Sequence, residues 1–208
     1  MRRSLSPAIL IGLLLIGSAV AGGAILSTRN DKPSSHADGE GDLAFTGSPD
    51  AWSAEVTDPQ GKTEFTYGID VCDQTGAGPI VLTSVAPTAY VGSGATLIGA
   101  QSFDRLPNAD GIMETEGYPP AEIPADRLRE LAGTKVSFRC DGAGWTEILI
   151  GLRANGTEGG GWRGVNVNYT VGGRSRSLLA NEYLVICGSN LRCHADMVTR
   201  DMPASKGP

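Results

Sequence analysis

Glu64-Phe-Thr-Tyr-Gly-Ile-Asp-Val-Cys72 is the stretch that decides the fold, because apolar and polar side chains alternate along it. Phe65, Tyr67, Ile69 and Val71 fall on one face of an extended chain. A period of two is typical of a β-strand with one buried face. The stretch therefore predicts a strand whose apolar face contributes to a core.

Short strands separated by turns are predicted along the rest of the chain. Residues 79–85 predict a strand that pairs with 64–72 as a hairpin across a Gly-rich turn. Gly172-Gly173 predicts a second tight turn. Further strands are expected at 96–100, 135–140, 146–153, 162–171, 174–179 and 183–187.

Two segments between these strands have a different character. Residues 102–124 are polar and rich in Pro, so we expect a long loop there. Residues 124–133 begin with Pro and end with Gly, the asymmetry typical of a helix. One short helix is therefore predicted over residues 124–133.

The number of strands favours an all-β fold, an antiparallel sandwich of about 7–8 strands with one short helix. The abundance of turn formers, 29 Gly and 12 Pro, agrees with it. Residues 52–187, with a strand, a Gly-rich turn and Pro79-Ile-Val-Leu-Thr-Ser-Val85, resemble the immunoglobulin-like β-sandwich modules of exported, membrane-anchored bacterial proteins. The resemblance implies a fold and carries no activity with it.

The N-terminus combines a basic start with an apolar segment. Residues 8–26 contain no charged side chain, and a helix of that length spans about 28 Å, close to the thickness of a bilayer core. Arg2 and Arg3 precede the segment, which places the following domain outside the cytoplasm. We expect a single-pass membrane anchor. The alternative is a signal peptide cleaved near Ala21, where small residues stand at 19 and 21.

The chain is expected to divide into four parts. They are an N-terminal signal or membrane anchor (1–27), a flexible linker (28–50), the β-sandwich domain (51–195) and a C-terminal tail (196–208). The linker is polar, and such a sequence buries too little apolar surface to order itself. The net charge of −6, from 17 basic and 23 acidic residues, excludes sequence-independent binding to nucleic acid.

The four cysteines, Cys72, Cys140, Cys187 and Cys193, all follow the apolar segment. An even number in an exported domain predicts disulfides, and four cysteines allow three pairings. We favour Cys72–Cys140, since each residue ends a predicted strand, and Cys187–Cys193, since only a short loop separates them. No Cys-x-x-Cys accompanies His194, so we expect no metal.

The long loop is the predicted contact region, because modules of this kind bind through loops. Its candidate contact residues are Asp104, Asn108, Asp110, Glu114 and Glu116. Residues 108–111 also match the middle of a calcium loop, an alternative to a solvated acidic loop. The positions that would open and close such a loop, Leu106 and Gly117, supply no side-chain ligand.

The sequence has no nucleophile elbow, no phosphate-binding loop and only one His in the predicted domain. We therefore expect a non-catalytic extracytoplasmic binding or interaction module without a cofactor, whose partner is a protein or a cell-envelope ligand. The alternatives are a secreted hydrolase that uses carboxylates such as Glu114, Glu116 or Glu147, and a structural component of the envelope.

Overall fold

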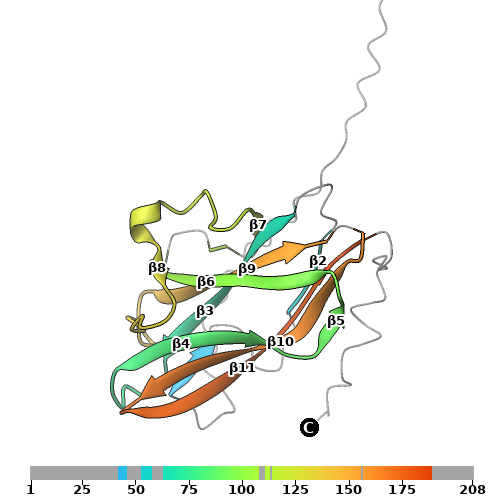
Figure 1. The fold of residues 1–208 in the computed structure, drawn as a ribbon. Helices are drawn as coiled ribbons and strands as arrows, with labels where there is room; N and C mark the ends of the chain where they lie inside the picture. Colours follow the sequence, from blue (N-terminus) through green and yellow to red (C-terminus); the bar gives the residue numbers. More distant parts are fainter. Residues whose placement is uncertain are drawn as a thin grey trace, which may run out of the picture. The chain divides into compact units, whose positions relative to one another are not determined.

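The computed structural model describes residues 42–45, 53–57, 63–107, 111–112, 114–155 and 157–188, with the backbone alone for 53–57. All of them belong to the unit Lys32–Pro208. They form nearly all-antiparallel β-structure in two sheets (Figure 1). The predicted all-β class is therefore confirmed. The predicted N-terminal anchor, the linker and the C-terminal tail lie outside the described residues.

Sheet A has the strand order β1-β3-β9-β6-β8. Strand β7 also pairs with β3, at Phe65–Tyr67, whereas β1 pairs with Val71–Asp73. Neighbouring strands in this sheet are antiparallel. The strands are β1 (Leu43–Phe45), β3 (Glu64–Asp73), β6 (Ala95–Arg105), β7 (Glu114–Glu116), β8 (Arg129–Glu130) and β9 (Trp145–Ala154).

Sheet B has the order β2-β11-β10-β4, and β5 also pairs with β10. Its strands are β2 (Ser53–Thr57), β4 (Ile80–Pro87), β5 (Tyr90–Gly92), β10 (Gly160–Val171) and β11 (Arg174–Ile186). Only β2 and β11 run parallel. Gly172 and Gly173 join β10 to β11 with φ of 55° and 77°, so the predicted tight turn is confirmed.

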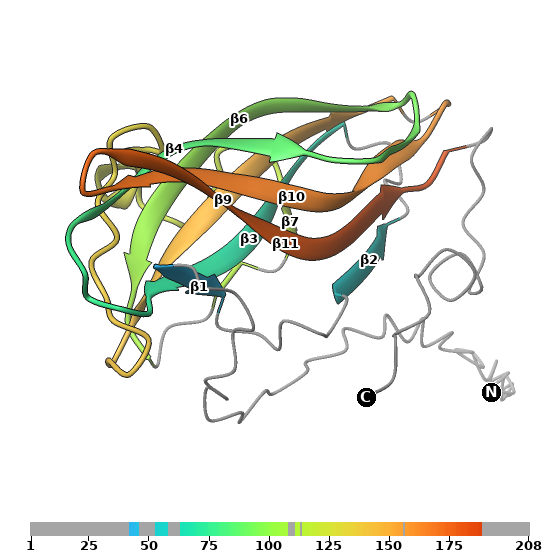
Figure 2. The same cartoon turned by 90° about the horizontal axis from the view of Figure 1, so that it is seen from below.

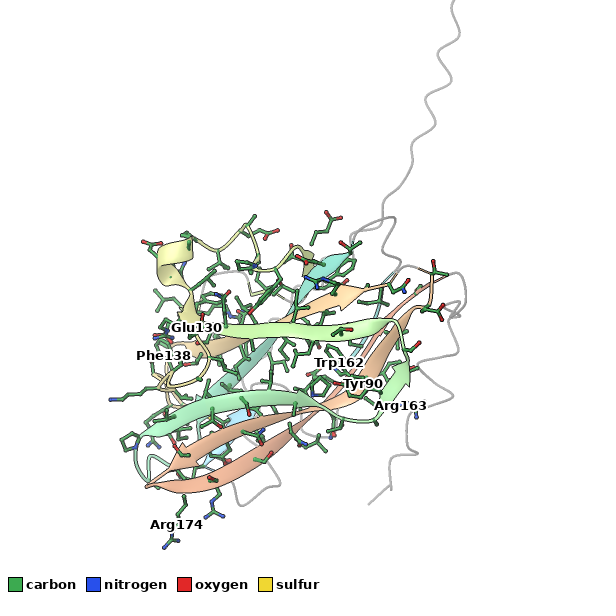
Figure 3. The ribbon with its side chains drawn as sticks, in the orientation of Figure 1. Tyr90, Glu130, Phe138, Trp162, Arg163 and Arg174 are labelled. Atoms are coloured by element: carbon green, nitrogen blue, oxygen red, sulfur yellow. A yellow bond between two sulfur atoms is a disulfide. The ribbon has the colours of Figure 1, made fainter. Side chains whose placement is uncertain are left out.

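The main core contains buried residues from both sheets. Figure 2 shows the two sheets from below. Phe65, Tyr67, Ile69 and Val71 are all buried in this core, as the alternation in β3 predicts. Sheet B contributes residues that include Leu82, Trp162, Val167 and Leu184. Figure 3 places Trp162 beside Tyr90, whose ring meets it edge-on with 6.5 Å between the centroids.

The predicted hairpin between residues 64–72 and 79–85 is wrong. These stretches form β3 and β4, which belong to different sheets. Alternation identifies a strand but does not specify its partner, which here is β10 for β4. The Asp73 carboxylate accepts backbone N–H bonds from Thr75 and Gly76 where the chain crosses between the sheets.

The predicted helix over residues 124–133 is also wrong. The structure has a single 3-10 turn, Ala125–Arg127, followed by strand β8. The cause is visible in the packing, because Leu128 contacts a cluster on the outer face of sheet A whereas Leu131 enters the main core. A helix would place residues three apart on the same side.

Residues 135–140 were predicted as a strand and instead form two isolated bridges. Lys135 pairs with Val81 of β4, and Arg139 pairs with Asp73 at the end of β3. The segment thus connects an edge of sheet B to the end of a strand in sheet A. The Cys72–Cys140 disulfide closes its far end, which confirms that predicted pairing.

Candidate functional site

We call residues 106–128, between β6 and β8, the excursion. Its described residues cover the outer face of sheet A. It lies on the side of sheet A that faces away from β4, β10 and β11 (Figure 1). Its Ile123 is buried together with Phe103 and Leu149 of the sheet, and Ile112 and Leu128 pack against them. Sheet A is therefore covered on both faces.

The prediction of one continuous loop over residues 102–124 is corrected by this arrangement. Residues 102–105 extend β6, and Glu114–Glu116 forms β7, which pairs with Phe65–Tyr67 of β3. The Thr66 hydroxyl also donates to the Gly117 carbonyl at 2.6 Å. The segment is a folded cover that is held on the sheet by the backbone pairing of β7 and by packed side chains such as Ile123.

Glycines in the strands make room for the cover. The ring of Tyr118 lies directly over Gly99 of β6 and Gly151 of β9, where no Cβ atom would fit. Burial raises the pKa of Tyr118 to about 12, and the neighbouring Glu130 carboxylate acts in the same direction. Gly68 of β3 admits the backbone carbonyl of Ile112 in the same way.

Three ionisable side chains meet beneath the excursion. Asp70 of β3 and Glu147 of β9 are directly opposite each other in the strand register. The guanidinium of Arg105, at the end of β6, forms an ion pair with Asp70 and lies 3.3 Å from Glu147, measured from Nε to Oε2. The N–H of Ile112 donates to Glu147 Oε1 at 2.6 Å.

The environment shifts both carboxyl groups in the same direction. Glu147 is only 1% exposed, and burial raises its pKa to about 8, with the Asp70 charge adding to the rise. Its bond from Ile112 and the nearby Arg105 act against the rise without cancelling it. Burial also raises the pKa of Asp70, against the opposing effect of Arg105.

A pKa raised to about 8 favours the protonated form of Glu147 at neutral pH, and a general acid needs that property. The Ile112 backbone lies against Glu147, and the Arg105 guanidinium stacks 4.9 Å from the centroid of the Trp145 ring. Only 1% of Glu147 is exposed to solvent. In this closed arrangement it bonds to the protein's own backbone.

Of the predicted contact residues, Asp104 forms several side-chain hydrogen bonds at the end of β6. Its two carboxylate oxygens accept bonds from Arg129 at 2.7 and 3.2 Å, from Ser137 at 3.0 Å and from Thr146 at 3.3 Å. These partners come from β8, from the segment after it and from β9. Asp104 thus joins three parts of the chain at the end of β6.

The other predicted contact residues are separated from Asp104. Glu114 and Glu116 are in β7, which pairs with Phe65–Tyr67 of β3, whereas Asp104 pairs with Thr146 near the start of β9. Asn108 and Asp110, on which the calcium alternative depends, lie outside the described residues. In the part of the chain that the structure describes, no three His, Cys, Asp or Glu side chains are grouped as metal ligands.

Sequence reasoning named Glu147 only as one possible acid and did not find Asp70, Arg105 or Tyr118. Strand glycines such as Gly151 were the available indication that something packs closely on this face. Cys187 is disulfide-bonded, and its predicted partner Cys193 lies outside the described residues.

No helix within the described ranges is long and apolar enough to cross a bilayer. The chain matches no protein-family model and no curated protein. The fold and the site together define a nearly all-antiparallel β-domain of two sheets. The Cys72–Cys140 disulfide links the end of β3 to the segment before β9, and the excursion covers the outer face of sheet A.

Proposed function

We propose that the chain is a non-catalytic binding or interaction module, displayed outside the cytoplasm on an immunoglobulin-like β-sandwich and tethered to the membrane by residues 8–26. The single observation that carries the proposal is the position of Glu147. Glu147, whose pKa burial raises to about 8, accepts a bond from the excursion's own backbone and is only 1% exposed. In this proposal Glu147 holds the excursion on sheet A and does not act on a substrate.

The excursion is the proposed contact surface. Its side chains on the solvent side include Leu106, which is 61% exposed at the point where the excursion leaves β6. Glu122 and Arg127 are exposed further along it. A rigid sheet carries this irregular segment, and binding residues in proteins are commonly presented in this manner.

Deletion of the excursion is an unsuitable test, because it would uncover Phe103 and Leu149. The better variant combines Leu106→Asp with Ala121→Arg, two exposed positions on the excursion. The matched control combines Leu179→Asp with Ala86→Arg, two exposed positions on sheet B. Both pairs leave the net charge unchanged.

The measurement is quantitative capture of partners from the cell envelope by the full-length chain. We expect the excursion variant to lose the partners that the wild type and the sheet B variant retain. Equal capture by all three proteins would contradict the proposal. Retention of the unprocessed chain in the membrane after an alkaline wash, checked by intact mass, tests the tether separately.

One observation supports the alternative of a secreted hydrolase, namely the raised pKa of Glu147. That function would require the excursion to lift and admit a substrate. A Glu147→Gln variant that loses a measured glycoside hydrolysis while keeping partner capture would favour the enzyme.

A further inference from the structure

The contacts of Glu147 link a titratable group to the position of the excursion. Glu147 Oε1 accepts the N–H of Ile112, and the Ile112 carbonyl lies over Gly68 in the neighbouring strand. Ile112 also packs against the cluster formed by Phe103 and Leu149. One residue of the excursion is therefore bound to sheet A by a polar and an apolar contact together.

Within the described residues, two carboxyl groups and one guanidinium group lie together around Glu147. Asp70 faces it from β3 and Arg105 faces it from β6, so one guanidinium serves two carboxyl groups. The excursion faces it with the backbone N–H of Ile112, and β9 adds the uncharged Trp145 ring against the guanidinium. Asp70 Oδ1 and Glu147 Oε2 are buried without a hydrogen-bond donor.

We propose that Asp70, Arg105 and Glu147 form a pH-sensitive latch, which holds the excursion on sheet A when Glu147 is protonated and loosens it when Glu147 ionises. The role of the latch in regulating binding rests on the proposed function, in which the excursion is the contact surface. The latch itself is a property of the domain and needs no partner.

Linkage gives the direction of the effect. Lifting Ile112 removes its N–H bond to Glu147, which favours the ionised form, but it also admits water. We expect the relief of burial to dominate and to bring the pKa of Glu147 from about 8 toward 4.5, the value of an ordinary glutamic acid. The docked excursion thus binds the proton more tightly than the lifted one, so docking weakens as the pH rises between these two values. Above about pH 8 the docked and lifted forms are both ionised, and the dependence levels off.

The test is hydrogen exchange of the Ile112 amide in the full-length chain, held in lipid nanodiscs, from pH 5 to 9. Rates are corrected for the intrinsic pH dependence of exchange. We expect protection to fall by up to about tenfold for each pH unit across the linkage window, and then to become constant. Corrected protection that stays the same from pH 5 to 9 would overturn the latch.

The Glu147→Gln variant keeps an acceptor at Oε1 and cannot ionise. Its Ile112 amide should stay protected, with no dependence on pH after correction. The matched control, Asp126→Asn, removes an exposed carboxylate from the same excursion and should behave as the wild type. A Glu147→Gln variant with the wild-type pH dependence would assign the effect to another group and reject the proposal.

A second measurement keeps the latch testable if Glu147→Gln folds poorly. Carboxyl carbon chemical shifts of the wild-type protein give the titration midpoint of Glu147 directly. A midpoint well above the ordinary range supports the latch, and an ordinary midpoint overturns it. Because neither measurement involves a partner, the latch and the contact surface can fail independently.

Discussion

The ring of Tyr118 lies over Gly151 with so little space between them that a Cβ atom at position 151 would overlap the ring carbons. Gly151 is on the outer face of β9, and Tyr118 belongs to the excursion that covers this face. The pair shows how the sequence builds the cover, since a glycine in the strand leaves the space that an aromatic ring fills.

Substitution of Gly151 by Ala should therefore destabilise the domain. Overpacking of this kind costs about 1–3 kcal/mol, which urea denaturation would detect. The cost should largely disappear when Tyr118→Ala is combined with Gly151→Ala, because the ring that meets the new methyl group is gone. An equal cost of Gly151→Ala in both backgrounds would show that Tyr118 is not the obstacle.

Replacement of Glu147 by Gln should stabilise the domain at alkaline pH. Since burial raises the pKa of Glu147 to about 8, the folded state holds the proton more tightly than the unfolded chain between pH 4.5 and about 8. Wild-type stability from this group is fully present below that window and is lost as the pH rises through it.

The free energy of unfolding of Glu147→Gln should accordingly exceed that of the wild type by up to about 4 kcal/mol at pH 8.5 and by less than about 1 kcal/mol at pH 5. Denaturant titrations at the two pH values measure both differences. A variant that is less stable than the wild type at pH 8.5 would mean that the ionised carboxylate is favourable where it is.

Removal of the Asp104 side chain should cost stability and leave binding intact. Asp104→Ala leaves Arg129, Ser137 and Thr146 without their shared acceptor. We expect a loss of about 1–3 kcal/mol, because the partly buried groups lose charge-assisted bonds. Asp126→Ala, on the exposed 3-10 turn, is the control and should change little. Normal stability of Asp104→Ala with lost partner capture would return Asp104 to the contact surface.

Loss of the Cys72–Cys140 disulfide should also be costly. The two residues are separated by 68 positions, and closing a loop of that length stabilises a protein by about 4 kcal/mol in the chain-entropy model. The Cys72→Ser, Cys140→Ser double variant tests this by thermal and urea unfolding. A loss of less than about 1 kcal/mol would show that the contacts of residues 135–140 already fix this end of the domain.

The alternation in β3 and the glycine pair after β10 were sufficient to predict those elements, since both are local properties of the sequence. The partners of β3 were not predictable in this way. Asp70 and Glu147 are brought together by strand pairing between segments far apart in the sequence, and neither residue is part of a motif.

The cover on sheet A was missed for a related reason. Thr66, Gly68 and Asp70 alternate with the apolar residues of β3, a pattern that normally indicates a solvent-facing side. Thr66 instead donates to the Gly117 carbonyl of the excursion, Gly68 leaves room for the Ile112 carbonyl, and Asp70 pairs with Arg105 of β6. The predicted helix failed because Leu128 and Leu131 belong to different clusters, and no local pattern records that difference.

Site-specific photo-crosslinking in intact cells tests most directly whether the excursion is the contact surface. A photoreactive side chain would replace Leu106 on the excursion or Leu179 on sheet B, which are 61% and 50% exposed. We predict partner adducts from position 106 and none from position 179. Adducts from position 179 alone would contradict the account and place the contact on the opposite sheet.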